Sequence, residues 1–303
     1  MPQVVHPKTP VKNVSYLRKI TAKDVKVASA QSNRNEWVEK FHPLSRLKIM
    51  LVDSHIHVGQ FTSFYISPND ISQLMDKIGV SRYAVSSTTI CDADYPKVLS
   101  EIQELIQLDG EKVLPIMWIT PEGLKGNIAW FLESNIPWRC LKIHPELHPD
   151  DWPADGNLMI EVIDIARELS LPLLIHTGNN DCCHANKYEA LYQNTPDITF
   201  ILAHGRPNIE AIRLAKQYDN VFVDSAFMPI YEMQAFLDNH ISNKLLWGTD
   251  MCIPKHFFPS EDMTEYYLNK LSAFKAISSQ REFEQVTFRN AAKLFNISLE
   301  QLN

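Results

Sequence analysis

The chain has 303 residues, of which 45% are hydrophobic and 21% charged, a composition typical of a folded protein with a substantial core. Its formal net charge of -7 and lack of a long basic run argue against nucleic acid as the main partner, because neutralising phosphates takes clustered Lys and Arg. The N-terminus has no apolar core of signal-peptide length, no later window approaches 18 uninterrupted apolar residues, and the five cysteines form no CxxC pair, which favours a cytoplasmic protein with reduced thiols and no membrane partner.

Residues 1–45 lie outside the regular pattern that follows and are predicted to form an N-terminal extension. They begin as a polar tail and continue into "QSNRNEWVEKFHPL", which we interpret as a short helix packed on the main domain. This extension is either a contact between subunits, which allows a homodimer, or a plug against the domain itself.

From residue 46 onward, short β-rich apolar runs alternate with longer segments of helical spacing. The predicted strands are 47–57, 82–89, 112–120, 139–145, 171–178, 198–205, 221–226 and 245–250. The predicted helices are 68–78, 95–109, 122–135, 156–170, 186–194, 207–218, 230–240 and 262–279, and residues 279–298 are predicted to add closing helices. Pro68 and Pro207 are helix-start signals.

Eight strand-helix units predict an α/β protein with either a (β/α)8 TIM barrel or an open doubly wound sheet. Candidate chemical groups follow strands 1, 4, 5, 6 and 8, and barrel enzymes assemble their sites at that end of the strands. An open sheet would gather such groups at one switch point, and no GxGxxG loop follows a strand. We therefore predict a TIM-barrel domain over residues 46–303.

The first strand ends in "DSHIH", where Asp53, His55 and His57 share one face because side chains alternate along a strand. Two imidazoles on that face suit either a divalent cation or a pair satisfied by other protein groups. We interpret Asp53 as a buried group that orients the two histidines.

Three further strands end in groups of the same kind. Strands 5, 6 and 8 finish with His176, His204 and Asp250. Taken singly, each has a structural explanation as a hydrogen-bond donor or a helix cap. Together they predict a site for one divalent ion, most suited to Zn, with Mn or Fe as alternatives.

These motifs resemble those of the amidohydrolase superfamily, specifically its amidohydrolase 2 branch related to aminocarboxymuconate-semialdehyde decarboxylase. The resemblance covers residues 50 to 296 through "DSHIH", "LKIHP", "IHTG", "LAHG", "WGTD" and the closing "RNAAKLFNI". It implies that one metal ion is held by His55, His57, His176 and Asp250, with His204 as a nearby catalytic group. The "LKIHP" form resembles the mononuclear branch, in which the lysine at the position of Lys142 is unmodified.

Such an ion lowers the pKa of bound water toward neutrality, and the resemblance implies that Asp250 accepts the water proton. His204 would then polarise the substrate carbonyl or stabilise its oxyanion. A carboxylate on a small-molecule substrate would be gripped by side chains at the strand ends, for which the candidates are Arg206, Lys142, His144 and Asn179. Trp247 and Tyr65 are either pocket walls or packing residues, and Cys182 and Cys183 lack the paired base of a nucleophile.

The sequence thus predicts a metal-dependent hydrolase of a small amide, ester or lactone. The alternative is a non-oxidative decarboxylase of an aromatic or unsaturated carboxylic acid, since the resembling branch contains both reactions. A catalytically silent metal scaffold is disfavoured, because the predicted proton acceptor and the paired histidines are all present.

Overall fold

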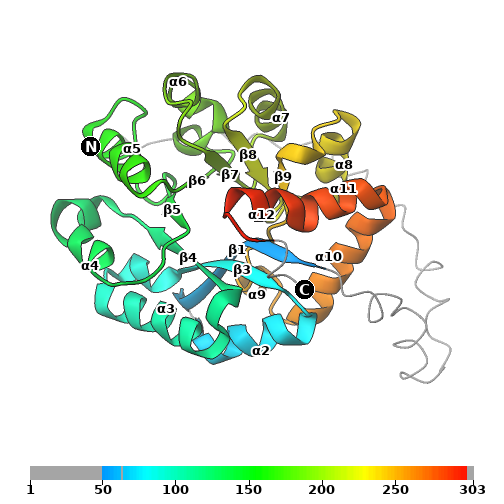
Figure 1. Ribbon diagram of the computed structural model, residues 1–303, viewed down its shortest axis with the longest axis horizontal. Coiled ribbons are helices and arrows are strands. Elements are labelled where there is room, and N and C mark those ends of the chain that lie inside the picture. The colour runs from blue at the N-terminus through cyan, green and yellow to red at the C-terminus, as the bar shows by residue number, and fades with distance from the viewer. Residues whose placement is uncertain (1–49, 63, 299–303) are drawn as a thin grey trace, which may run out of the picture. The chain divides into compact units, whose positions relative to one another are not determined.

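The computed structural model describes residues 50–62 and 64–298, in which strands and helices alternate around a closed parallel sheet, as the sequence predicted (Figure 1). The parallel strands pair in chain order, so each lies beside the parallel strand that precedes it in the sequence. The eight parallel strands are β1 (Val52–Phe61), β3 (Arg82–Ser87), β4 (Val113–Trp118), β5 (Cys140–Ile143), β6 (Leu173–His176), β7 (Phe200–Ala203), β8 (Val221–Asp224) and β9 (Leu245–Leu246). The predicted (β/α)8 barrel is confirmed.

The barrel closes where the last strand meets the first. Past β9, the backbone amide of Ser54 donates to the carbonyl of Trp247 at 2.8 Å. The amide of Asp250 donates to the carbonyl of His55 at 2.8 Å, and Ile56 and Met251 form a parallel bridge. These bonds bring Asp250 beside the two histidines of β1, although about two hundred residues separate them in the sequence.

Helices cover the outside of the barrel close to where their spacing predicted them. They are α2 (Pro68–Ile78), α3 (Tyr95–Asp109), α4 (Ile128–Leu132), α5 (Asn157–Leu169), α6 (Glu189–Asn194), α7 (Asn208–Gln217), α8 (Ile230–Asp238), α9 (Pro254–Phe257) and α10 (Met263–Ile277). At α2 the start signal works as predicted: Ser67 caps the helix in a capping box with Asp70, and Pro68 takes the first helical position. Pro207 lies one residue before α7, as its N-cap.

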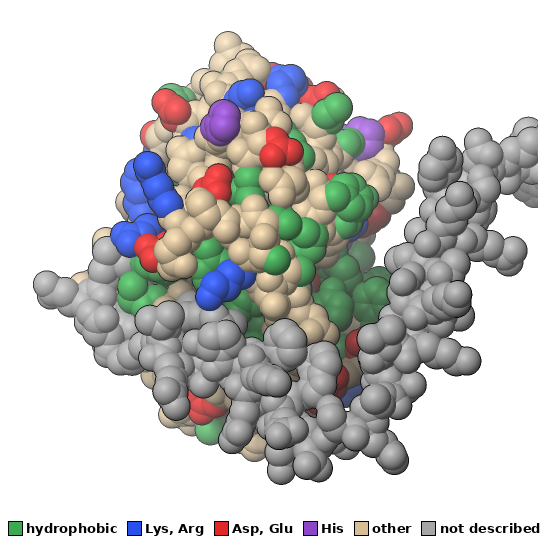
Figure 2. Space-filling view, turned by 90° about the vertical axis from the view of Figure 1, so that its right-hand side faces the viewer, with side chains coloured by type: hydrophobic (Ala, Val, Ile, Leu, Met, Phe, Trp, Pro, Cys, Tyr) green, Lys and Arg blue, Asp and Glu red, His purple; other side chains and the backbone are tan. Residues whose placement is uncertain are grey.

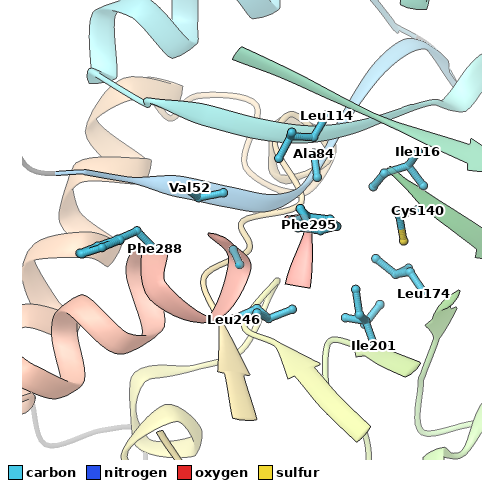
Figure 3. Close-up of a cluster of buried hydrophobic side chains, with 12 residues drawn as sticks. Val52, Ala84, Leu114, Ile116, Cys140, Leu174, Ile201, Leu246, Phe288 and Phe295 are labelled. Atoms are coloured by element: carbon cyan, nitrogen blue, oxygen red, sulfur yellow. The ribbon is translucent and has the colours of Figure 1, made fainter. Parts of the chain in front are cut away.

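The closing segment forms α11 (Gln280–Glu284), a π-helical turn (Gln285–Arg289) and α12 (Asn290–Leu294), and it seals the end of the barrel where the strands begin (Figure 1). Phe288, Ala291 and Phe295 pack against Val52 and Leu246 at that end, and each of these side chains is at most 4% exposed. Figure 3 shows Phe295 in the centre of this cluster, among side chains from several strands. The C-terminal segment therefore plugs the barrel.

Helix α9 lies where no helix was predicted, and two further regions differ from the predicted elements. Strand β1 runs past the predicted end to Phe61 and folds back as a hairpin with β2 (Phe64–Ile66), pairing Gly59 with Ile66. The predicted helix 122–135 is a π-helical turn, Gly123–Asn127, followed by the short α4. The predicted N-terminal extension lies outside the described residues.

No helix in the described ranges has both the length and the apolar character needed to cross a membrane. On the face shown in Figure 2, acidic and basic side chains are interspersed with apolar ones. The cytoplasmic location and the homodimer stay predictions.

Candidate metal centre

Three side chains converge where β1 and the segment after β9 meet. The Nε2 atoms of His55 and His57 lie 3.2 Å apart, and Oδ1 of Asp250 lies 3.4 Å from the first and 2.9 Å from the second. All three residues are at most 6% exposed. A tetrahedral zinc ion with bonds of about 2.0–2.1 Å places two ligand nitrogens about 3.3 Å apart, so this spacing fits a shared ion.

The hydrogen bonds on the far side of each ring show which nitrogen is free to bind an ion. Nδ1 of His55 lies 2.9 Å from the Asp224 carboxylate, and Nδ1 of His57 lies 3.3 Å from the carbonyl oxygen of Ser86. The Asp224 carboxylate only accepts, so a neutral His55 carries its hydrogen on Nδ1 and its Nε2 lone pair faces inward. The Ser86 hydroxyl, 3.1 Å from Nδ1 of His57, can donate or accept, but the Lys142 ammonium 3.1 Å from Nε2 of His57 only donates, which leaves the lone pair of this ring on Nε2 as well. The two Nε2 lone pairs and the Asp250 carboxylate then converge, and these three acceptors require a positive charge between them.

Lys142 on β5 supplies positive charge at this point. Its Nζ lies 3.0 Å from Nε2 of His55, 3.1 Å from Nε2 of His57 and 4.3 Å from the centre of the Trp118 ring. Burial lowers the pKa of Lys142 to about 8, although the negative charges of Asp250 and Asp224 act to raise it. An ion that binds both imidazoles therefore takes the place that this ammonium holds.

The protonation states suit metal ligation. Burial, with the neighbouring Lys142, lowers the pKa of His57 to about 3, so its ring is neutral at neutral pH. Burial alone would raise the pKa of Asp250, but the contacts with His55 and His57 hold it well below its usual value. Neutral imidazoles and an ionised carboxylate are the forms that bind divalent metals.

His176, the fourth predicted ligand, lies outside this group of three. Its Nδ1 is 3.1 Å from Nε2 of His204, and its Nε2 is 2.9 Å from the Glu146 carboxylate. His204 lies between the two sets, with its ring centre 5.5 Å from that of His55 and 4.8 Å from that of His176. For His176 to reach an ion at the first three ligands, its ring must turn away from Glu146.

A cavity of about 1130 Å³ opens over this centre. Three of the predicted substrate-binding residues, Lys142, His144 and Arg206, line it, whereas Asn179 is exposed and is not among its lining residues. Its walls also carry aromatic rings from Phe61, Trp118, Phe227, Phe257 and Phe258. A pocket with apolar walls and a few charged groups is typical of a small-molecule site.

Neither of the two aromatic residues proposed as pocket walls is among the residues that line the cavity. Trp247 is fully buried, and its indole nitrogen donates to the hydroxyl of Tyr267 at 2.9 Å, so it is a packing residue. Tyr65, on β2, is 43% exposed. Burial raises the pKa of the Cys183 thiol to about 12, which fits the prediction that this cysteine is no nucleophile.

Two acidic residues that sequence reasoning missed organise the histidines. One oxygen of Asp224 holds Nδ1 of His55, and the other accepts from the backbone amide of His204 at 3.0 Å. Glu146 holds His176 in the same way. Asp224 ends its strand in "VFVDSA" at the edge that carries the other candidate groups, and that position was a signal for it. The loop position of Glu146, two residues after His144, gave none.

Asp53, predicted to orient the histidines, does so through the backbone. Its carboxylate accepts from the amide of His55 at 3.1 Å and from the hydroxyl of Thr249 at 2.6 Å. It thereby ties β1 to the segment that carries Asp250. Burial raises the pKa of Asp53 to about 6.

Solved structures share this fold at low sequence identity. An uncharacterized TIM-barrel protein from Bordetella bronchiseptica is 14% identical, with a TM-score of 0.59 over 84% of this chain and 99% of that one. A probable 2-pyrone-4,6-dicarboxylic acid hydrolase from Acinetobacter baumannii is 14% identical, with a TM-score of 0.58 over 81% and 99%. A 5-carboxyvanillate decarboxylase from Novosphingobium aromaticivorans, solved with manganese and a nitrobenzoic acid, is 10% identical, with a TM-score of 0.60 over 82% and 96%.

The sequence itself also has a family match. Among curated proteins none matches the chain. The sequence profile of a family described as amidohydrolase, Amidohydro_2, matches residues 117–297, which is more than half of the chain and includes His176, His204 and Asp250. The protein therefore belongs to the Amidohydro_2 branch of the amidohydrolase superfamily.

Proposed function

We propose that the protein is a metal-dependent hydrolase that acts on a small amide, ester or lactone. The observation that carries this proposal is the convergence of His55, His57 and Asp250, whose ligand atoms all lie within 4.8 Å of one another, with His57 and Asp250 lining the cavity. We propose these three as ligands of one divalent ion, Zn first, with Mn or Fe as alternatives. His176 remains the proposed fourth ligand.

A divalent ion held there would supply a water molecule activated for attack and would polarise a substrate carbonyl. The protein's own groups then handle the proton. Asp250 is ionised and faces the cavity, so it is the acceptor for the proton of the attacking water.

His204 is suited to pass this proton on. Its Nδ1 lies 3.1 Å from the carbonyl oxygen of Ala226, which fixes a hydrogen on that nitrogen. Burial lowers the pKa of His204 to about 3, so Nε2 carries a lone pair at neutral pH. His204 must therefore first accept a proton before it can donate one to the leaving group or to a developing oxyanion.

Arg206 is the residue that we propose binds a substrate carboxylate. It lines the cavity, and among the described residues its guanidinium makes one hydrogen bond, to the carbonyl of Phe227 at 3.2 Å. A guanidinium has five N–H donors in a planar fork, so most remain for a carboxylate. His144 also lines the cavity, and we propose that it contacts the substrate beside Lys142.

The second candidate function is decarboxylation of an aromatic or unsaturated carboxylic acid. The observation that favours it is the aromatic wall beside the cations: Trp118 stacks on His144 with 5.5 Å between ring centres and carries Lys142 over its face. A planar acid would fit such a wall. Both a hydrolase and a decarboxylase occur among the similar solved structures.

A product assay on the metal-loaded protein separates the two functions. Lactones, esters and amides would be tested beside aromatic carboxylic acids, with acid release and carbon dioxide release measured together. We expect acid release without carbon dioxide, abolished by a chelator and restored by Zn²⁺ or Mn²⁺. Carbon dioxide release would establish the decarboxylase instead, and inactivity of fully loaded protein toward the whole panel would favour a metal scaffold.

Binding of a substrate carboxylate by Arg206 can be tested separately. Matched substrates with a carboxylic acid or with the neutral amide at the same position would be compared in the wild type and in Arg206→Gln. We expect KM to rise about 10-fold or more for the acid, since hydrogen bonds to charged groups contribute about 1.5–3 kcal/mol, and to change little for the amide. Equal changes for both would remove Arg206 from carboxylate recognition.

A further inference from the structure

The cavity over the metal centre has an apolar part where it opens to solvent. Three large apolar side chains line the cavity and yet stay exposed: Leu147 is 50% exposed, Phe257 59% and Phe258 44%. An aromatic residue that only packs, such as Trp247, is fully buried. Apolar surface that stays exposed within a cavity is typical of a binding surface.

A row of rings connects this surface to the proposed catalytic groups. The ring centre of Phe227 lies 6.2 Å from that of His204 on one side and 5.6 Å from that of Phe257 on the other. The backbone carbonyl of Phe227 also accepts from the Arg206 guanidinium. An apolar group that follows these rings therefore leads from His204 and Arg206 out to solvent.

The rings at the mouth of the cavity are held in place by the protein itself. On α9, the ring of His256 packs edge to face on Phe61 of β1, with 5.4 Å between ring centres. Phe258 stacks on Tyr266 of α10, with 5.9 Å between ring centres. Both chain neighbours of Phe257 are thus fixed, and a wall that is already ordered loses little conformational entropy when a ligand binds.

We propose that Phe61, Leu147, Phe227, Phe257 and Phe258 form an aryl subsite, a second part of the substrate site that binds an aromatic group. The aryl subsite rests on the proposed function and narrows the substrate to an amide, ester or lactone with an aromatic ring remote from the scissile bond. Four of the five side chains are phenyl rings, and aromatic groups favour ring contacts with centres about 4.5–7 Å apart. The cavity volume of about 1130 Å³ lies above the about 300–1,000 Å³ typical of small-molecule sites and leaves room for such a group.

A substrate group suits this surface better than a second copy of the chain does. The aryl subsite lies in the same cavity as His57, Asp250 and Arg206, so a ligand held by these groups can extend onto it. A partner protein would have to insert a segment into this cavity and would then cover the proposed catalytic groups.

Ligand binding tests the aryl subsite without any reaction. The full-length protein, in buffer with Zn²⁺, would be titrated with 2-naphthylacetate, whose ring fluorescence reports binding, and the affinity for acetate would be measured by displacement. We expect 2-naphthylacetate to bind at least about 10-fold more tightly than acetate, because its rings leave water for an apolar wall. Equal dissociation constants for the two anions would overturn the proposal.

A single variant assigns the preference to its residue. Phe257→Ala removes a ring that is largely exposed, and we expect the ratio of the two dissociation constants to fall by at least about 3-fold. The matched control is Trp130→Ala on α4, which removes a ring that is 47% exposed and does not line the cavity, and it should keep the wild-type ratio.

An unchanged ratio in Phe257→Ala would contradict the aryl subsite. If the same variant also lost a dimer that the wild type forms, as measured by sedimentation, the surface would instead be a contact between copies of the chain.

Two esters of the same alcohol separate this proposal from the proposed function. We expect kcat/KM to be at least about 10-fold higher for the 2-naphthylacetate ester than for the acetate ester. Metal-dependent hydrolysis of both esters at equal kcat/KM would remove the aryl subsite and leave the hydrolase intact. Tighter binding of 2-naphthylacetate that is lost in Phe257→Ala, without hydrolysis of either ester, would support the aryl subsite and count against the hydrolase.

Discussion

The two ends of the barrel are built from the same strands and hold opposite chemistry. Where the strands begin, Phe288 and Phe295 fill the opening with apolar side chains. Where they end, His55, His57 and Asp250 are equally buried, but their partners are other polar groups. The comparison teaches that burial serves stability at one end, while at the other it fixes lone pairs and charges in place.

This contrast predicts that substitutions at the two ends separate cleanly into effects on activity and effects on stability. The polar end should lose function with the fold retained, because its groups contribute more to chemistry than to packing. The apolar end should lose stability with the activity of each folded molecule retained.

The largest effect is expected at the proton acceptor. Asp250→Asn keeps an oxygen for the metal but removes the proton acceptor, so kcat should fall by about 10²–10⁴-fold while some metal remains bound. Steady-state kinetics with metal analysis measures both. Asp92→Asn, a carboxylate on the same cavity wall, is the matched control and should stay within a few-fold of the wild type. Unimpaired turnover in Asp250→Asn would remove this aspartate from the mechanism.

The next largest effect is expected on stability, at the apolar end of the barrel that Phe288 and Phe295 fill. Phe295→Ala leaves a void beneath the strands and should lower the free energy of unfolding by about 3–5 kcal/mol, with kcat per folded molecule unchanged. Chemical denaturation and active-site titration check the two parts. Phe258→Ala, at the cavity and 44% exposed, is the control and should cost far less stability. If Phe295→Ala lost activity without losing stability, the division between the two ends would not hold.

The smallest effect is expected at Asp224, which holds the ring of the proposed ligand His55. Asp224 accepts from Nδ1 of His55 through one oxygen and from two backbone amides through the other, and an amide has only one acceptor oxygen for both tasks. Asp224→Asn should therefore weaken metal binding by about 10–100-fold, measured by competition with a chelator. The exposed Asp219→Asn serves as the control, and equal metal affinities in both variants would show that Asp224 does not tune the centre.

Much of the barrel could be predicted because its signals are local. Buried runs such as 173–176 and caps such as Ser67 with Asp70 depend on nearby residues only, and the alternation of strands and helices adds up to the fold. The hairpin strand β2 was missed because three residues without a turn signal carry too little pattern.

The site was predictable only in part. Strand ends identified which residues gather at one edge, since parallel strands all end there, and His55, His57 and Asp250 do meet. The direction of the His176 ring depends on rotation about its side-chain bonds and on Glu146, a loop residue without periodicity. Asp224 resembles an ordinary helix cap in the sequence, and only its spatial neighbours reveal its contact with His55.

Closure of the barrel between the segment after β9 and β1 has a consequence for biosynthesis. His55 and His57 leave the ribosome about two hundred residues before Asp250, and the three side chains meet only when the amide of Asp250 donates to the carbonyl of His55. A truncated or half-made polypeptide would offer the ion a pair of imidazoles and no carboxylate. Tight metal binding would then depend on closure of the barrel between β1 and the segment after β9.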